Sequence, residues 1–159
     1  MKIYETSEDI AELARNKFAE TYLEQVGINL NIISVTKSKS VLKVSKASAV
    51  LRHLTNKDVI LTVYEDAFDR LSDEAKAILM EGALSNVSFD TEKDKLNVDS
   101  DIAKEIFRMR TKYDNYVDIL EASYIVASEI EEEEKKRKAE EKARKEEAKK
   151  NKKSRNDYE

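Results

Sequence analysis

The sequence predicts an α+β fold, in which a short mixed sheet packs on helices and a long charged helix ends the chain. Two segments, 28–35 and 58–64, are rich in β-branched residues and have the length of strands. Around them, apolar residues recur at helical spacing behind Ser or Asp caps. Near the end, residues 131–150 hold 17 charged residues and three alanines, a composition typical of a solvated helix.

The first third of the chain predicts one helix followed by two strands. Thr6 to Asp9 supplies a hydroxyl cap and first-turn acids, and apolar residues follow at helical spacing. We expect this helix to end near Gly27, a plausible residue for a helix terminus. A strand over 28–35 and a shorter one over 41–44 should follow, with a polar turn between them.

The middle of the chain predicts a short helix over 47–54 and then the clearest strand, 58–64. That strand is almost entirely apolar or β-branched, which indicates burial on both faces. After a short connector, Ser72 should cap a helix that runs to about Val87. Segments 87–90 and 95–98 read as a small hairpin, and Asp101 should open a third helix.

A fourth helix is expected from Asp114 or Asn115. Its first half is apolar, and past Ile130 acids precede bases at i,i+4 spacing, each pair contributing about 0.2–0.5 kcal/mol. This predicts a single solvated helix that frays after Asn151; a disordered tail is the alternative, and the lack of an apolar seam disfavours a coiled coil. The expected organisation is an α+β domain over 1–114, an amphipathic helix over 115–130 that docks on it, and a charged helix or tail over 131–159.

Composition excludes several classes of protein. The chain has no cysteine, so it has neither a thiolate zinc site nor a cysteine nucleophile, and His53 is its only histidine. We expect His53 to be a packing or surface residue. No run is long and apolar enough to span a membrane, and the start is unlike a signal peptide, so a soluble intracellular protein is expected. The net charge is −4, and the first 130 residues carry about −6, which argues against a nucleic-acid-binding core.

Residues 41–114 resemble the putative phage metallopeptidase family, a small zincin-like group. The resemblance is carried by segments 41–46, 51–55 and, above all, 58–81. In this family a strand ends in an acidic-aromatic connector, and the following helix bears a zinc-binding His-Glu-Leu-x-His motif. The resemblance implies a zincin-like domain, to which residues 1–40 are also assigned; residues 115–159 have no counterpart in it.

By position, the motif of the family is degenerate in this chain. The first metal-binding histidine falls on Gly82, the catalytic glutamate on Ala83 and the second histidine on Asn86. A further family histidine falls on Ser100, while the next residue, Asp101, is retained. We therefore predict no catalytic residue, no bound metal and no other cofactor. Restoring His, Glu, His and His at these four positions should create zinc affinity if the correspondence is right.

Residues near these positions allow alternatives to this interpretation of the site. Asn86, Asp90, Asp99 and Asp101 could offer oxygen ligands to Ca²⁺ or Mg²⁺, although such acids more often cap helices or face solvent. Glu81 is not a displaced catalytic base, because it lies about 100° around the helix from position 82 with no imidazole near it. The small residues at 82 and 83 would let the old cleft close or accept the side chain of a partner.

The first functional hypothesis is a pseudoenzyme of phage origin that acts as a structural or protein-interaction module. Its partner would be a phage or host protein, in the host cytoplasm or in the virion. The alternatives are a metal-dependent peptidase with an oxygen-ligand site, and a nucleic-acid accessory protein that uses the basic cluster at 149–155. Tyr116 and Tyr124 would either pack on the domain or form a docking face, and core packing is favoured.

Overall fold

The computed structural model describes residues 1–158 and confirms the α+β class. The chain divides into two compact units, Met1–Ala127 and the segment that begins at Ser128. The first unit contains a four-stranded sheet, a two-stranded sheet and five complete helices, and the sixth helix begins within it. All residues of the candidate site belong to this unit.

The four-stranded sheet is mixed, as predicted. Its order is β1 (Ile3–Glu5), β2 (Leu30–Val35), β4 (Val59–Val63) and β3 (Leu42–Lys46). β2 and β4 run parallel, while β1 and β3 pair antiparallel with their neighbours and form the two edges. One face of β4 is completely buried and the other is half-buried. The prediction that both faces are buried is therefore correct for only one face. β1 was not predicted, because its three residues are exposed and held only by pairing.

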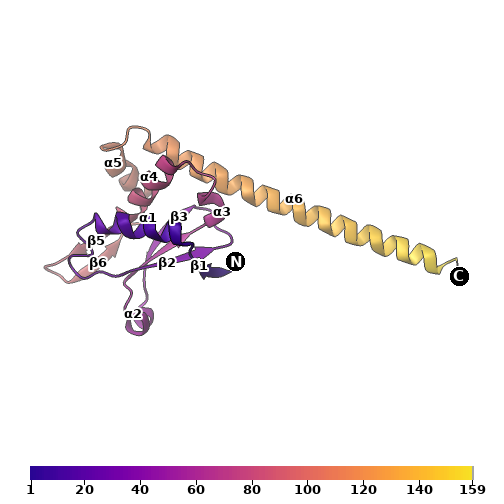
Figure 1. Cartoon of the computed structure of the whole chain (residues 1–159), viewed down its shortest axis with the longest axis horizontal. Helices are drawn as coiled ribbons and strands as arrows, with labels where there is room; N and C mark the ends of the chain where they lie inside the picture. Colours follow the sequence, from indigo (N-terminus) through magenta and orange to yellow (C-terminus); the bar gives the residue numbers. More distant parts are fainter. Residues whose placement is uncertain (159) are drawn as a thin grey trace. The chain divides into compact units, whose positions relative to one another are not determined.

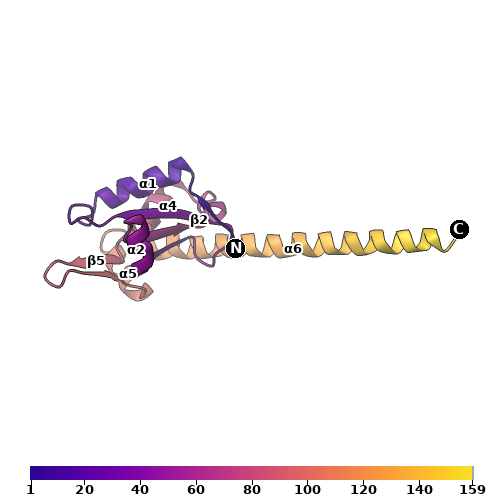
Figure 2. The ribbon, with the colours of Figure 1, turned by 90° about the horizontal axis from the view of Figure 1, so that it is seen from below.

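Helices α1 (Glu8–Ala19) and α4 (Asp73–Leu84) pack against each other and against the sheet, α1 on β2 and α4 on β3 (Figures 1 and 2). Ala14 and Phe18 of α1 and Leu79 and Met80 of α4 are buried in the core that results. Ser72 caps α4 as predicted, because its hydroxyl accepts a hydrogen bond from the backbone N–H of Ala75 at 3.2 Å.

The prediction that the first helix reaches Gly27 is wrong, since α1 ends at Ala19. The hydroxyl of Thr21 donates to the carbonyl of Phe18 at 2.6 Å, which caps the last turn with a side chain. The chain then turns so that Leu23 is buried and accepts a backbone hydrogen bond from Ile28. Gly27 has a positive φ of 86° and closes this later turn.

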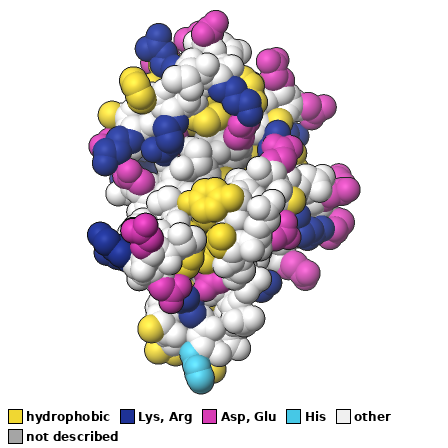
Figure 3. All heavy atoms as spheres, turned by 90° about the vertical axis from the view of Figure 1, so that its left-hand side faces the viewer, with side chains coloured by type: hydrophobic (Ala, Val, Ile, Leu, Met, Phe, Trp, Pro, Cys, Tyr) yellow, Lys and Arg dark blue, Asp and Glu magenta, His cyan; other side chains and the backbone are white. Residues whose placement is uncertain are grey.

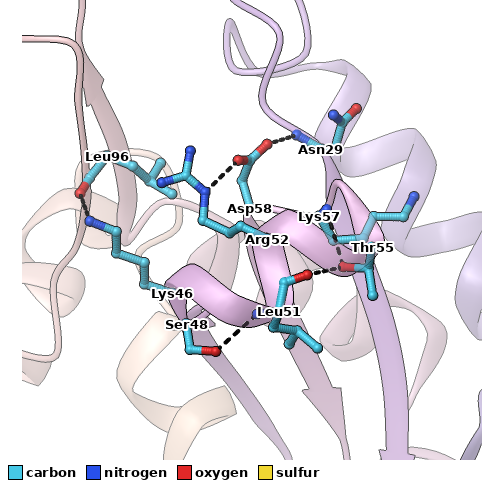
Figure 4. Close-up of polar contacts among 9 residues, drawn as sticks. All are labelled: Asn29, Lys46, Ser48, Leu51, Arg52, Thr55, Lys57, Asp58 and Leu96. Atoms are coloured by element: carbon cyan, nitrogen blue, oxygen red, sulfur yellow. Dashed lines mark hydrogen bonds and ion pairs between the residues drawn. The ribbon is translucent and has the colours of Figure 1, made fainter.

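The remaining elements of the first unit follow the predicted order. They are α2 (Ala49–Thr55), the one-turn α3 (Glu65–Phe68), the β5–β6 hairpin (Val87–Asp90 and Lys95–Val98) and α5 (Ile102–Arg110). Figure 4 shows the polar contacts that anchor α2 and the strands beside it. Asp58 accepts from the Arg52 side chain at 3.0 Å and from the Asn29 backbone at 2.8 Å, and Lys46 donates to the carbonyl of Leu96 at 3.3 Å.

Helix α6 runs from Tyr116 to Asn156, beyond the predicted fraying point at Asn151. In the second unit, three of the predicted i,i+4 ion pairs form, Glu131–Lys135, Glu134–Lys138 and Glu141–Lys145, at 3.1, 2.8 and 2.6 Å. Such pairs stabilise a helix that has no apolar face to bury. Within residues 1–158, no helix combines the length and apolar character needed to cross a membrane.

Candidate functional site

The four positions that the resemblance assigns to the motif lie near one another in the first unit. Gly82 and Ala83 lie in the last turn of α4, Asn86 lies just before β5, and Ser100 lies just before α5. Ala83, Asn86 and Ser100 line a single pocket of about 340 Å³. The other walls come from the start of β3, from α5 and from the first turns of α6. Three of the four positions therefore line one cavity, and Gly82 precedes one of them in α4.

Gly82 is covered by a side chain of the chain itself. A Cβ atom added to Gly82 would lie 2.1 Å from the hydroxyl oxygen of Tyr116 and 2.8 Å from its Cζ. Tyr116 is 0% exposed and packs with Ile78 and Met109, so a shift of its ring would disturb these contacts. The phenol thus occupies the volume that any side chain at position 82 would need.

Asn86 is engaged by two other side chains. Its Nδ2 donates to Oε1 of Glu105 at 3.2 Å, and its Oδ1 accepts from Nη2 of Arg108 at 2.6 Å. Both partners come from α5, so the amide links the end of α4 to that helix. The amide is therefore committed to a polar network within the fold.

Glu105 is the buried charge of the pocket, with only 6% of its surface exposed. Burial raises its pKa, and the Asn86 amide, the Tyr116 phenol and the positive charge of Arg108 oppose this only in part. Burial also raises the pKa of Tyr116, and the charge of Glu105 adds to it, so the phenol stays neutral. The Tyr116 hydroxyl is near Glu105 but has no partner at hydrogen-bonding geometry.

These residues do not fit a zinc ion. Gly82 and Ala83 offer no ligand atom, Tyr116 fills the space above Gly82, and both ends of the Asn86 amide are bonded. Across residues 1–158, no group of three or more His, Cys, Asp or Glu side chains is placed to hold a metal ion.

The acids of the alternative oxygen-ligand site serve the local backbone. Asp99 accepts from the N–H of Asp101 at 2.9 Å, a bond that lowers the pKa of Asp99, and Asp101 caps α5 by accepting from Ala103 at 3.0 Å. Both line the pocket. Asp90 does not line the pocket. Its carboxylate accepts from the N–H groups of the β5–β6 turn. The structure therefore separates Asp90 from the other candidates.

Glu81 and His53 lie outside the pocket lining. Glu81 accepts from the hydroxyl of Tyr113 at 2.6 Å and from the ammonium of Lys112, which ties α4 to the segment between α5 and α6. His53 is exposed on α2, beside a separate hollow lined by Arg52 and Asn56. The single histidine of the chain, cyan in Figure 3, lies at the surface of that face.

Sequence reasoning missed Glu105, Arg108 and the contact of Tyr116 with Gly82. One signal was present: Glu105 precedes the apolar Met109 by four residues, which places both on one face of α5. Both are buried in the structure. The sequence contained no corresponding sign of the Tyr116 contact, because the two residues are 34 positions apart.

Replacing Glu105 with glutamine is expected to stabilise the protein at neutral pH. The folded state holds the Glu105 proton more tightly than the unfolded chain, whose pKa is near the usual 4.5, so this group makes stability fall as pH rises from 4.5 through the raised pKa. Glutamine removes that loss and still accepts from Asn86. Urea unfolding from pH 4 to pH 8 should show a gain for Glu105→Gln that grows with pH.

Glu81→Gln is the matched control and should behave in the opposite way. Burial acts to raise the pKa of Glu81, but the hydrogen bonds from Lys112 and Tyr113 outweigh it and the pKa is lowered. Glu81 therefore contributes stability above its unfolded pKa, which is lost as pH falls through the lowered value. Equal pH profiles for the two variants would contradict the assignment of Glu105 as the buried, under-compensated carboxyl.

The comparison with protein families gives one match. A family model described as putative phage metallopeptidase matches residues 2–134. The match is wider than the resemblance over 41–114 and takes in the first strand and helix and the start of α6. No curated protein and no solved structure was found to match the chain significantly.

Proposed function

The chain belongs to the putative phage metallopeptidase family, and from this premise we propose that it is a non-catalytic member that binds a partner protein in its pocket. The observation that carries the proposal is the phenol of Tyr116 above Gly82. It occupies the first position of the motif, where the resemblance puts a histidine. A pocket remains beside it, so the loss of the ligands has left a cavity that is free to bind.

The hydrolytic chemistry of a metallopeptidase needs a metal ion to lower the pKa of water and a carboxylate to take its proton. Gly82 and Ala83 hold the positions that resemble the first ligand and the carboxylate, and neither carries a polar side chain. Glu105 is the buried acid of the pocket, but its carboxylate already accepts from the Asn86 amide, whose other end is bonded to Arg108. These features support binding without hydrolysis.

β3 is an edge strand of the four-stranded sheet and offers the backbone for such binding. The carbonyl of Val41 and the N–H of Ala47 bond to the residues that flank β4, at 2.9 Å each. Residues of an antiparallel pair alternate, so the N–H and C=O groups of Leu42 and Val44 point away from β4. Both residues line the pocket, so an extended segment could pair with β3 and place a side chain in the cavity.

The proposed partner is a phage or host protein, met in the host cytoplasm or in the virion. The family supports the phage context, and the pocket at a sheet edge supports recognition of an extended segment. The charged helix of the second unit offers a further, separate surface for a partner.

The test is selection of a random heptapeptide library on the purified full chain, followed by affinity measurement with single peptides. Selected peptides should bind the wild type and lose binding to Val44→Pro, which removes one outward N–H at a tolerated edge position. Val50→Ala is the matched control, because Val50 is 70% exposed on α2 and lies outside the pocket. This variant should bind the peptides as the wild type does. Prolonged incubation with Zn²⁺ should leave the bound peptide intact by mass spectrometry.

Two results would overturn the proposal. The first is zinc-dependent cleavage of a bound peptide, or stoichiometric zinc retained by the purified protein. The second is the failure of the library to yield any peptide whose binding depends on Val44.

A further inference from the structure

Three of the side chains that line the pocket, those of Glu105, Tyr116 and Ser123, carry hydrogen-bond acceptors. Glu105 is 94% buried, and its charge acts on both Tyr116 and Tyr124. The hydroxyl of the buried Ser123 donates to the carbonyl of Leu120 at 2.6 Å, which leaves its oxygen free to accept. The oxygen of Tyr116 is fully buried and unpartnered. One carboxylate and two hydroxyl oxygens thus converge on one cavity.

The charged groups that line the pocket are mostly acidic. Asp99, Asp101 and Glu105 contribute to the lining, and Lys43 is the basic residue among them, exposed on β3. Arg108 is turned toward the Asn86 amide and does not line the cavity. A buried carboxylate without a direct ion-pair partner favours a cation or a strong donor beside it.

The pocket also has an apolar lining. Leu79, Ala83 and Leu120 contribute to it together with Val44 of β3. A straight aliphatic chain that enters from the β3 edge could pack along these side chains. An apolar lining beside a buried carboxylate matches the stem and head of a lysine side chain.

We propose that the pocket receives a lysine side chain of the bound segment, with its ammonium placed at Glu105 and the hydroxyls of Tyr116 and Ser123. The three N–H groups of an ammonium match the three acceptors, and its charge balances Glu105. An arginine fits less well, because its planar fork needs acceptors in one plane. This inference rests on the proposed function, since the lysine belongs to a segment held along β3.

The test uses four synthetic pentapeptides, acetyl-Thr-Val-X-Val-Thr-amide, with lysine, norleucine, arginine or glutamate at X. Binding to the full chain is followed by NMR titration. The lysine peptide should bind about tenfold more tightly than the norleucine peptide, the size expected of a charge-assisted hydrogen-bonded pair. Glu105→Gln should remove this preference, so that the lysine and norleucine peptides bind this variant with equal affinity. Asp90→Asn, which changes net charge equally outside the pocket, should keep the preference.

The outcomes separate this inference from the proposed function. If the lysine and norleucine peptides bind equally and both depend on Val44, the function stands and the lysine site is wrong. If the preference for lysine survives Glu105→Gln, or falls equally in Asp90→Asn, the attraction is a general effect of charge and the lysine site is again wrong. If no pentapeptide and no library peptide binds at β3, both proposals fail.

Discussion

Replacing Gly82 with alanine is expected to destabilise the protein by about 1–3 kcal/mol, the usual cost of overpacking a core. In an ordinary helix the same change stabilises by about 0.5–1 kcal/mol. The sign is reversed here because the new Cβ would lie 2.1 Å from the Tyr116 hydroxyl, and a shift of the buried ring would disturb its packing with Ile78 and Met109. Urea unfolding of the two proteins measures the difference directly.

A double-mutant cycle tests whether Tyr116 is the cause. In a Tyr116→Leu background, Gly82→Ala should cost less or even stabilise, with a coupling of about 0.5–3 kcal/mol. Gly27→Ala is the matched control: it is strained by its positive φ of 86°, has open space around it, and should cost the same in both backgrounds. An equal cost of Gly82→Ala with and without Tyr116 would contradict the close packing.

Zinc binding is expected to return only when Tyr116 is removed together with the four motif substitutions. The variant with Gly82→His, Ala83→Glu, Asn86→His and Ser100→His still has the phenol in the space that a histidine at 82 needs. Adding Tyr116→Ala opens that space, and we expect affinity for zinc at least ~100-fold tighter than in the fourfold variant, since three imidazoles then meet at one cavity.

The measurement is competition for Zn²⁺ with a chromogenic chelator, supported by thermal unfolding with and without zinc, because a ligand that binds only the folded state raises its stability. Gly82→His with Tyr116→Ala is the control, which supplies one imidazole and should bind weakly. If the fourfold variant binds zinc as tightly as the fivefold variant, the Tyr116 side chain must move aside for the histidine. Failure of the fivefold variant to bind would place the motif elsewhere.

The sequence predicted the elements that are marked by local patterns. The hairpin strands 87–90 and 95–98 and the helix behind Ser72 were found because alternation and capping are local properties. The end of α1 was missed because it depends on a single hydroxyl bond, from Thr21 to Phe18. β1 was missed because pairing with β2, and not burial, makes it a strand.

The positions of the candidate site were predicted from the resemblance, but what now occupies the site was not. Gly82 could be read as a lost ligand, while the phenol above it comes from a helix 34 residues later and obeys no local pattern. Glu105 was not singled out in the sequence, because glutamate is rarely buried without a partner. Its burial depends on the Asn86 amide, a contact between α5 and the end of α4.

The contact of Tyr116 with Gly82 also restricts the mutational paths open to this protein. A larger side chain at position 82 and a tyrosine at position 116 exclude each other, so a path between the two by single substitutions must pass through a chain with glycine at 82 and a smaller residue at 116. That intermediate has a cavity in place of the phenol, which destabilises the core. The two positions are therefore expected to change together.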